Sequence, residues 1–368
     1  MERFRQWSQR ANAQERAAAI AQLAETWLDD QVDDCDRRQT EQAFTLYLDD
    51  PNLAVRVALA NAVAPHSHAP RKLIWALMQD IPDVSAVVFQ QSTALRPADL
   101  LHAIERNDPA IQTAIASRQD LGVDPVRALV RQGGAQAAVT LLENPSVRLS
   151  PMLKHDLAER LRHDARLRGV LLEDDQILPQ TRHLLVSTVS ESLRHLGSFE
   201  GWVDDDRMAI TALDASGKAA VEIASALTPS EMANYVTHLR STNQLTAAVL
   251  LRAVCIGNLG LFQAGVANLS GASFGRVGSI MSSARPSALN ALFAKAGLSK
   301  SALLVSIAAL QIWKWSQSEE EALSEIVAAV EESQEIDAAT LALLGRMACD
   351  IDRDAVRYMR ADIELQAA

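Results

Sequence analysis

Hydrophobic residues recur along much of the chain at the spacing of an α-helix. After Asp50-Pro51, for example, apolar residues occupy one helical stripe through Val55, Ala58, Leu59, Ala62 and Val63. An earlier stripe runs through Ile20, Leu23, Ala24, Trp27 and Leu28. Hardly any segment shows the period-two alternation of a half-buried strand. The pattern therefore predicts an all-α fold.

Short turn signals separate these stripes in the N-terminal half. The signals are Asp50-Pro51, Pro82-Asp83, Asn107-Asp108-Pro109, Asp124-Pro125 and Asn144-Pro145. An Asp side chain can cap a helix N-terminus, and Pro suits the first helical position. We therefore expect Asp50 to be an N-cap. Because a capped helix follows a shorter helix repeatedly, the pattern predicts an α-solenoid in this half.

Three of the turns resemble HEAT-like repeats, in which an Asp-Pro turn and a following Val-Arg pair mark the second helix. The copies are 50–56, 124–127 and 144–148. Their spacing is shorter and less regular than the roughly 40–47 residues of typical HEAT repeats. We therefore expect degenerate repeats built from short helices.

Acidic residues and a proline interrupt the pattern between Glu173 and Pro179. This break predicts a HEAT-like repeat domain over residues 1–175 and an α-helical domain over residues 180–368. In the second domain a helix is expected around 185–196, then a loop over 197–206 that holds Trp202. Further helices are expected through residue 315, followed by apolar stripes at 323–330 and 341–348.

The composition and net charge of the chain disfavour several classes of function. Hydrophobic residues make up 48% of the 368 residues, aromatics only 4%, and the net charge is −11. Such a charge disfavours binding to nucleic acid or anionic lipid through the overall field. Three cysteines without a C-x-x-C pair predict thiols that are free and buried, in a reducing compartment. With no signal peptide and no apolar run long enough to span a bilayer, we expect a cytoplasmic protein without a membrane anchor.

Several short motifs along most of the chain resemble an uncharacterised bacterial family, domain of unknown function 2336. They lie at 69–73, 92–95 with 99–101, 112–118, 261–264, 268–271 and 294–298. The resemblance implies a HEAT-like N-terminal half and an α-helical C-terminal half. It brings no activity and no catalytic residues.

Two segments partly match the sequence patterns of catalytic motifs. Gly271 to Gly275 matches G-x-S-x-G, but the segment before Ser273 is helical in pattern, whereas a nucleophile elbow follows a strand. We expect a tight corner between helices there. Asp214 to Ala219 echoes a phosphate loop, but it lacks the first Gly and the Ser or Thr that holds Mg²⁺. A turn before a helix near Lys218 is expected instead.

Metal and acid–base sites are weakly indicated. His66 and His68 have no third ligand at a suitable spacing, so no metal site is expected. The runs at 204–206 and 319–321 are typical of solvated loops and helix N-termini. The sequence thus indicates no catalytic site and no cofactor, and we expect a non-enzymatic protein.

One basic segment stands out in the acidic chain. Between Arg148 and His183 it contains the candidate binding residues Arg148, Lys154, Arg160, Arg162, Arg166, Arg168 and Arg182. They could dock an acidic partner, a nucleotide or a phosphate backbone. The alternative, which we favour, is pairing with nearby acids of the same chain, at positions 156, 159, 164, 173 and 174.

The leading functional hypothesis is an adaptor or regulator that binds a protein partner through the solenoid surface. One alternative is nucleic-acid binding or base excision through the basic segment, with Trp202 for stacking; we consider nucleic acid an improbable ligand. Another is nucleotide sensing through the same arginines and the segment 274–276. The sequence identifies neither the partner nor the oligomeric state.

Overall fold

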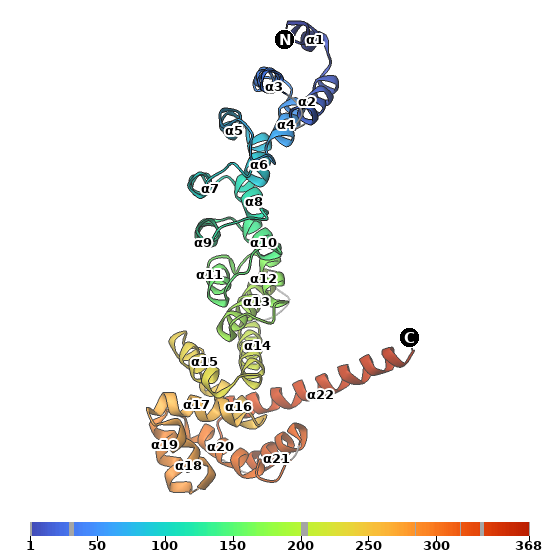
Figure 1. The fold of residues 1–368 in the computed structure, drawn as a ribbon. Coiled ribbons are helices and arrows are strands. Elements are labelled where there is room, and N and C mark those ends of the chain that lie inside the picture. The colour runs from blue at the N-terminus through green and yellow to red at the C-terminus, as the bar shows by residue number, and fades with distance from the viewer. Residues whose placement is uncertain are drawn as a thin grey trace. The chain divides into compact units, whose positions relative to one another are not determined.

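The computed structural model describes residues 2–28, 33–199, 205–283, 285–316, 318–331 and 335–367. These residues form 22 helices and no strand (Figure 1). The all-α fold expected from the hydrophobic pattern is therefore confirmed. The chain divides into two compact units, residues 1–177 and 178–368.

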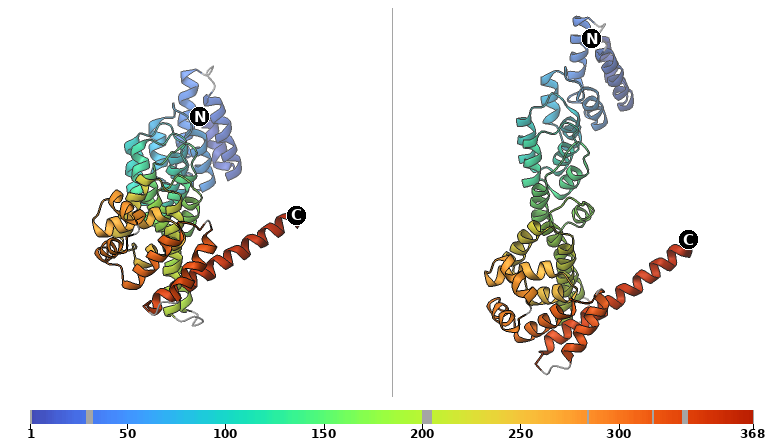
Figure 2. Two further views of the ribbon diagram at one scale, coloured as in Figure 1. Left: turned by 90° about the horizontal axis from the view of Figure 1, so that it is seen from below. Right: turned by 60° about the horizontal axis from the view of Figure 1, so that its bottom comes forward.

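The first unit is a stack of short helices in two rows. The even-numbered helices α2, α4, α6, α8, α10 and α12 each contact the next in the series, and α7, α9 and α11 form a second row (Figures 1 and 2). This arrangement fits the predicted solenoid. The bounds are α1 Glu2–Arg10, α2 Ala13–Leu28, α3 Asp34–Leu46, α4 Leu53–Val63, α5 Arg71–Met78, α6 Pro82–Gln91, α7 Pro97–Glu105, α8 Pro109–Ala116, α9 Val123–Gln132, α10 Ala135–Glu143, α11 Pro151–Leu161 and α12 Ala165–Leu172.

The apolar stripes form the core of this stack. In α4, Val55, Leu59 and Val63 are completely buried. Because α4 lies between α2 and α6, its buried face contacts the helices before and after it in the row. The hydrophobic area removed from water is therefore shared between neighbouring helices of the row, as expected for a repeat array.

Polar side chains at the turns connect one repeat to the next. Arg16 of α2 forms an ion pair with Asp50, with 2.7 Å between Nε and Oδ2. Arg56 of α4 pairs in the same way with Asp80, also at 2.7 Å, and its Nη1 donates to the carbonyl of Asp50. Because each carboxylate lies in a turn, these pairs position the start of the following helix.

Two buried side chains continue this pattern further along. Arg118 donates to the carbonyls of Phe89 and Ser92, and Asn144 donates to the carbonyls of Ala116 and Arg118. Buried carbonyls at helix ends need such donors, because the last turn of a helix leaves them without an internal partner.

The predicted caps are only partly correct. Asp108 is the N-cap of α8 and accepts from the amides of residues 110 and 111. For Asp50 the prediction is wrong: the N-cap of α4 is Asn52, and the Asp50 carboxylate is engaged by Arg16. Asp124 lies inside the first turn of α9, and Asn144 ends α10 rather than starting a helix.

The second unit consists of ten helices in its described residues, with a core of its own formed chiefly by α14 to α22. At its centre α16 contacts α14, α17, α20, α21 and α22. The bounds are α13 Pro179–Phe199, α14 Asp205–Ser225, α15 Pro229–Ser241, α16 Ala247–Cys255, α17 Leu259–Ser270, α18 Phe274–Ser283, α19 Pro286–Lys295, α20 Lys300–Ile312, α21 Glu319–Glu331 and α22 Ala338–Ala367.

Several local expectations for this unit are wrong. The helix expected around 185–196 is present, but α13 continues through Gly197 to Phe199, and Trp202 lies outside the described residues. No turn occurs before Lys218, because α14 is continuous from Asp205 to Ser225. Gly217 thus lies inside a helix whose following turn contains the buried Ala220 and Val221, and such packing can override the low helix propensity of Gly.

The cysteine prediction is also partly wrong. All three thiols are free, but only Cys255 is buried, whereas Cys35 and Cys349 are exposed. Burial raises the pKa of the Cys255 thiol to about 12. Among the described residues, no helix is both long and apolar enough to cross a membrane.

Candidate functional site

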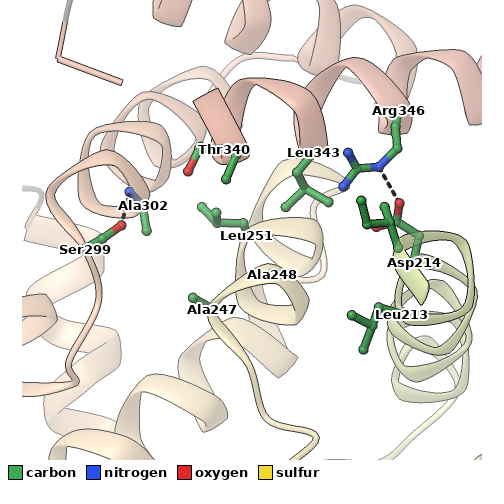
Figure 3. Close-up of a pocket in the computed structure, with 12 residues that line it drawn as sticks. Leu213, Asp214, Ala247, Ala248, Leu251, Ser299, Ala302, Thr340, Leu343 and Arg346 are labelled. Carbon is green, nitrogen blue, oxygen red and sulfur yellow. Dashed lines mark hydrogen bonds and ion pairs between the residues drawn. The ribbon is translucent and has the colours of Figure 1, made fainter. Parts of the chain in front are cut away.

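A groove in the second unit lies between α14 and α22, over α16 and the start of α20. It comprises two adjoining cavities, which share Ile210, Asp214 and Arg346 in their linings. We call the residues that line these two cavities the α14–α22 groove. Figure 3 shows the first cavity and the helices that supply its side chains.

The first cavity is apolar and has a volume of about 270 Å³. Leu213 of α14, Leu251 of α16 and Leu343 of α22 point toward its interior (Figure 3). Small residues of α16 and α20 complete the lining: Ala247, Ala248 and Ala302. Leu213 is 71% exposed, so an occupant of this cavity would cover apolar surface that now contacts water.

A network of ion pairs between arginine and aspartate side chains connects the helices that form the groove. Arg252 of α16 is only 5% exposed; its Nη2 donates to Asp214 at 3.3 Å, and its Nη1 lies 3.7 Å from an Asp350 oxygen. The other Asp214 oxygen accepts from Arg346 of α22 (Figure 3). A buried guanidinium requires such carboxylates, because an isolated charge in the interior is very costly. The network thereby connects α14, α16 and α22.

The second cavity is larger, about 680 Å³, and more basic. Arg207, Lys218 and Arg353 line it together with Arg346. Its two acids are Asp214 and Asp350, which contact Arg252. Positive charge therefore predominates in this cavity, in a protein whose net charge is −11.

Small side chains keep the second cavity open. Ala215 of α14 faces Ala342 and Gly345 of α22 across it. A Cβ atom added at Gly345 would meet nothing within 4 Å. Gly is unfavourable in a helix interior by about 0.5–1 kcal/mol relative to Ala, yet here it leaves space beside the helix. A larger side chain at this position would enter the groove.

Sequence reasoning missed this groove. Arg252 stands alone in the apolar stretch 247–255, where the hydrophobic pattern indicates only a core helix. A lone Arg in a buried helix indicates a carboxylate partner. The partners, Asp214 and Asp350, are 38 and 98 residues away, so the pattern of the sequence could not identify them.

The candidate residues of the predicted basic segment are divided between the two units. Arg182 belongs to the second unit, and the other six candidates to the first. Lys154 pairs with Asp174, and Arg166 with Glu143 at 3.2 Å. The structure thus brings these two cations to acids of the same chain, one of which, Glu143, was not among those expected.

The four remaining candidates in the first unit have contacts of other kinds. Arg160 donates to the carbonyl of Val130 at 3.1 Å, and its burial lowers the pKa of its guanidinium. Arg168 donates to the carbonyl of Arg162 at 2.7 Å, while Nε of Arg162 lies 3.4 Å from a ring nitrogen of His163. Arg148 is exposed. These contacts favour a structural role for Arg160 and Arg168.

The weaker motifs occupy loops and helix ends. Gly271 ends α17 in a left-handed conformation, and the Ser273 hydroxyl accepts from the amide of Arg276 at 3.4 Å, at the start of α18. The expected helix–helix corner is confirmed. His66 contacts the ring of Trp27, and no cluster of three potential metal ligands occurs in the part of the chain that the structure describes. Glu319 to Glu321 form the first turn of α21, as expected.

One further buried titratable group lies away from the groove. His183 of α13 is 2% exposed, and its Nδ1 lies 2.7 Å from the hydroxyl of Tyr235. Burial, together with the nearby His238, lowers the pKa of His183 to about 4. Burial also raises the pKa of Tyr235. Both groups are therefore neutral at pH 7, which suits a place in the core.

The chain belongs to a family described as an uncharacterised protein conserved in bacteria, domain of unknown function 2336, whose model matches residues 84–357. The match includes the last helices of the first unit and almost all of the second, with every residue of the α14–α22 groove named above. Neither the curated proteins nor the solved structures contain a significant match to the chain.

Proposed function

We propose that the protein is a non-enzymatic adaptor or regulator that binds a protein partner. The observation that carries this proposal is the α14–α22 groove, which combines exposed apolar side chains with a basic lining. Such mixed linings are typical of helix-in-groove recognition. The expected binding surface is the solenoid, whereas the groove with exposed apolar side chains lies in the second unit.

The first unit supports the proposal in a different way. Its repeats form an extended surface, and its described cavity at the α3–α4 turn is polar and mostly acidic, with Asp49, Asp50 and Asp80. We infer that this unit provides an additional contact surface. The basic segment is not proposed as a nucleotide or nucleic-acid site, because several of its cations contact groups of the chain itself.

Affinity capture of the full chain tests the proposal. The tagged protein is expressed at its native level in its own bacterium, crosslinked briefly and purified. We expect at least one other protein in a fixed, near-stoichiometric ratio that persists in moderate salt. Recovery of the chain alone, at the mass of a single species in native mass spectrometry, would contradict an adaptor role.

A further inference from the structure

We propose that the occupant of the α14–α22 groove is an amphipathic helix of the partner, with an apolar stripe and acidic residues. This inference rests on the proposed function, since it gives the chemistry of the partner at the same groove. The apolar stripe would enter the first cavity, against Leu213 and Leu343. The acidic residues would face Arg207, Arg346 and Arg353.

The lining residues on α14 and on α22 each cover a stretch as long as a short helix. On α14 the lining runs from Arg207 to Lys218, and on α22 from Ala339 to Arg353. At 1.5 Å per residue these stretches span about 17 and 21 Å. A helix of three to four turns has this length at a pitch of about 5.4 Å.

The charge of the lining selects for acidic residues. Asp214 and Asp350 both contact the buried Arg252, whose positive charge offsets much of their negative charge. Arg207 and Arg353 are exposed at the second cavity. Carboxylates on a docked helix would meet these guanidiniums, with which they can form two parallel hydrogen bonds. A basic helix would instead be repelled.

The surroundings of Gly345 provide independent support. The position lies inside the long helix α22, and even a Cβ atom there would touch no atom outside its own helix within 4 Å, so Gly or Ala leaves this part of the groove open. Together with Ala215 and Ala342 it allows another backbone to approach closely. A small residue at this point therefore suits a docked helix rather than the packing of α22 itself.

A displayed library of helical peptides, each about four turns or roughly 14 residues long, tests the inference. Apolar, acidic and basic residues are randomised, and binders are selected on the wild-type full chain and then counter-selected on the Gly345→Phe variant. We expect selected peptides to carry an apolar i, i+3, i+7 stripe and an excess of Asp and Glu. An enriched set that is basic or neutral, or the absence of any discriminating binder, would overturn the inference.

Three variants then locate the site of binding for one selected peptide. By fluorescence anisotropy, Gly345→Phe should weaken binding at least about tenfold, because the ring enters the space that the docked helix would occupy, whereas the matched control Gly345→Ala should bind like the wild type. Arg353→Glu should weaken binding and reduce its dependence on salt. Thermal melts check that each variant is folded. Equal affinity of the wild type, Gly345→Phe and Arg353→Glu would overturn the inference.

The outcomes separate this inference from the proposed function. If Gly345→Phe still captures the cellular partner, the adaptor role stands, and the inference is overturned because the groove is not its site. If peptides bind as expected but no partner is captured, the groove chemistry stands and the adaptor role fails. A wild-type dimer by light scattering that Gly345→Phe dissociates would assign the groove to a second copy and overturn the inference.

Discussion

Replacing Asp50 by Ala should destabilise the first unit much more than the loss of a helix cap would. The Asp50 carboxylate is 7% exposed and accepts three hydrogen bonds: two from Arg16, at 2.7 and 2.9 Å, and one from the amide of Asn52 at 2.9 Å. Arg16 itself is 15% exposed. The substitution would leave its guanidinium poorly solvated and without this carboxylate.

The magnitude follows from these contacts. Breaking a buried ion pair by removing one partner costs about 3–5 kcal/mol, and we expect about 3 kcal/mol because Arg16 keeps some contact with water. The matched control is Asn52→Ala, which removes the actual N-cap of α4 and should cost about 1 kcal/mol. The pair Arg16→Met and Asp50→Ala completes a double-mutant cycle, in which the double variant should be less destabilised than the sum of the single variants.

Urea unfolding of the full chain, followed by far-UV circular dichroism, measures the differences. The midpoint of the first-unit transition should fall clearly further for Asp50→Ala than for Asn52→Ala. If the two variants lose the same stability, or if the cycle shows no coupling between Arg16 and Asp50, the ion pair does not hold the α3–α4 turn against α2 and the reasoning is refuted.

Three further predictions concern other parts of the chain. Asp214→Ala should cost about 3 kcal/mol in urea unfolding, because it leaves Arg252 buried beside a more distant carboxylate, and an unchanged midpoint would argue against the network. The pKa of His183 is about 4 in the folded protein and 6.5 in the unfolded chain, so folding stability should decrease as the pH falls from 6.5 toward 4, by at most about 3 kcal/mol. His183→Gln should remove most of this pH dependence of the melting temperature. Identical pH profiles for the wild type and the variant would contradict the prediction. A fragment of residues 1–177 should fold alone and melt cooperatively, as followed by circular dichroism. Leu59→Asp in this fragment should prevent folding, because it places a charge at a completely buried position. An insoluble or molten wild-type fragment would mean that the two units share one core.

The local pattern of the sequence predicts the helices well because it depends on neighbours three and four residues apart. In the α4 stripe Val55, Leu59 and Val63 are buried as expected, whereas Ala58 and Ala62 are only half-buried. Asp108 caps α8 as expected. Both features are set by residues within one or two turns. The family resemblance was likewise carried by short local motifs, and the matched family model confirms it.

Features that depend on distant residues were not predictable in this way. Asp50 has the sequence context of a cap, but Arg16, 34 residues earlier, engages its carboxylate, and Asn52 takes the cap position instead. The groove also depends on residues that are distant in the sequence, since Asp214, Arg252 and Arg346 belong to three separate helices. Their proximity follows from the packing of α14, α16 and α22 rather than from any local pattern.

The most direct test of partner binding at the groove compares three forms of the full chain in the native bacterium. Wild type, Gly345→Ala and Gly345→Phe are expressed at equal levels, captured, and analysed by quantitative mass spectrometry. We expect one stoichiometric partner with wild type and Gly345→Ala, and its recovery should be at least about tenfold lower with Gly345→Phe. Equal recovery of that partner with all three forms, or no partner with any of them, would contradict the account.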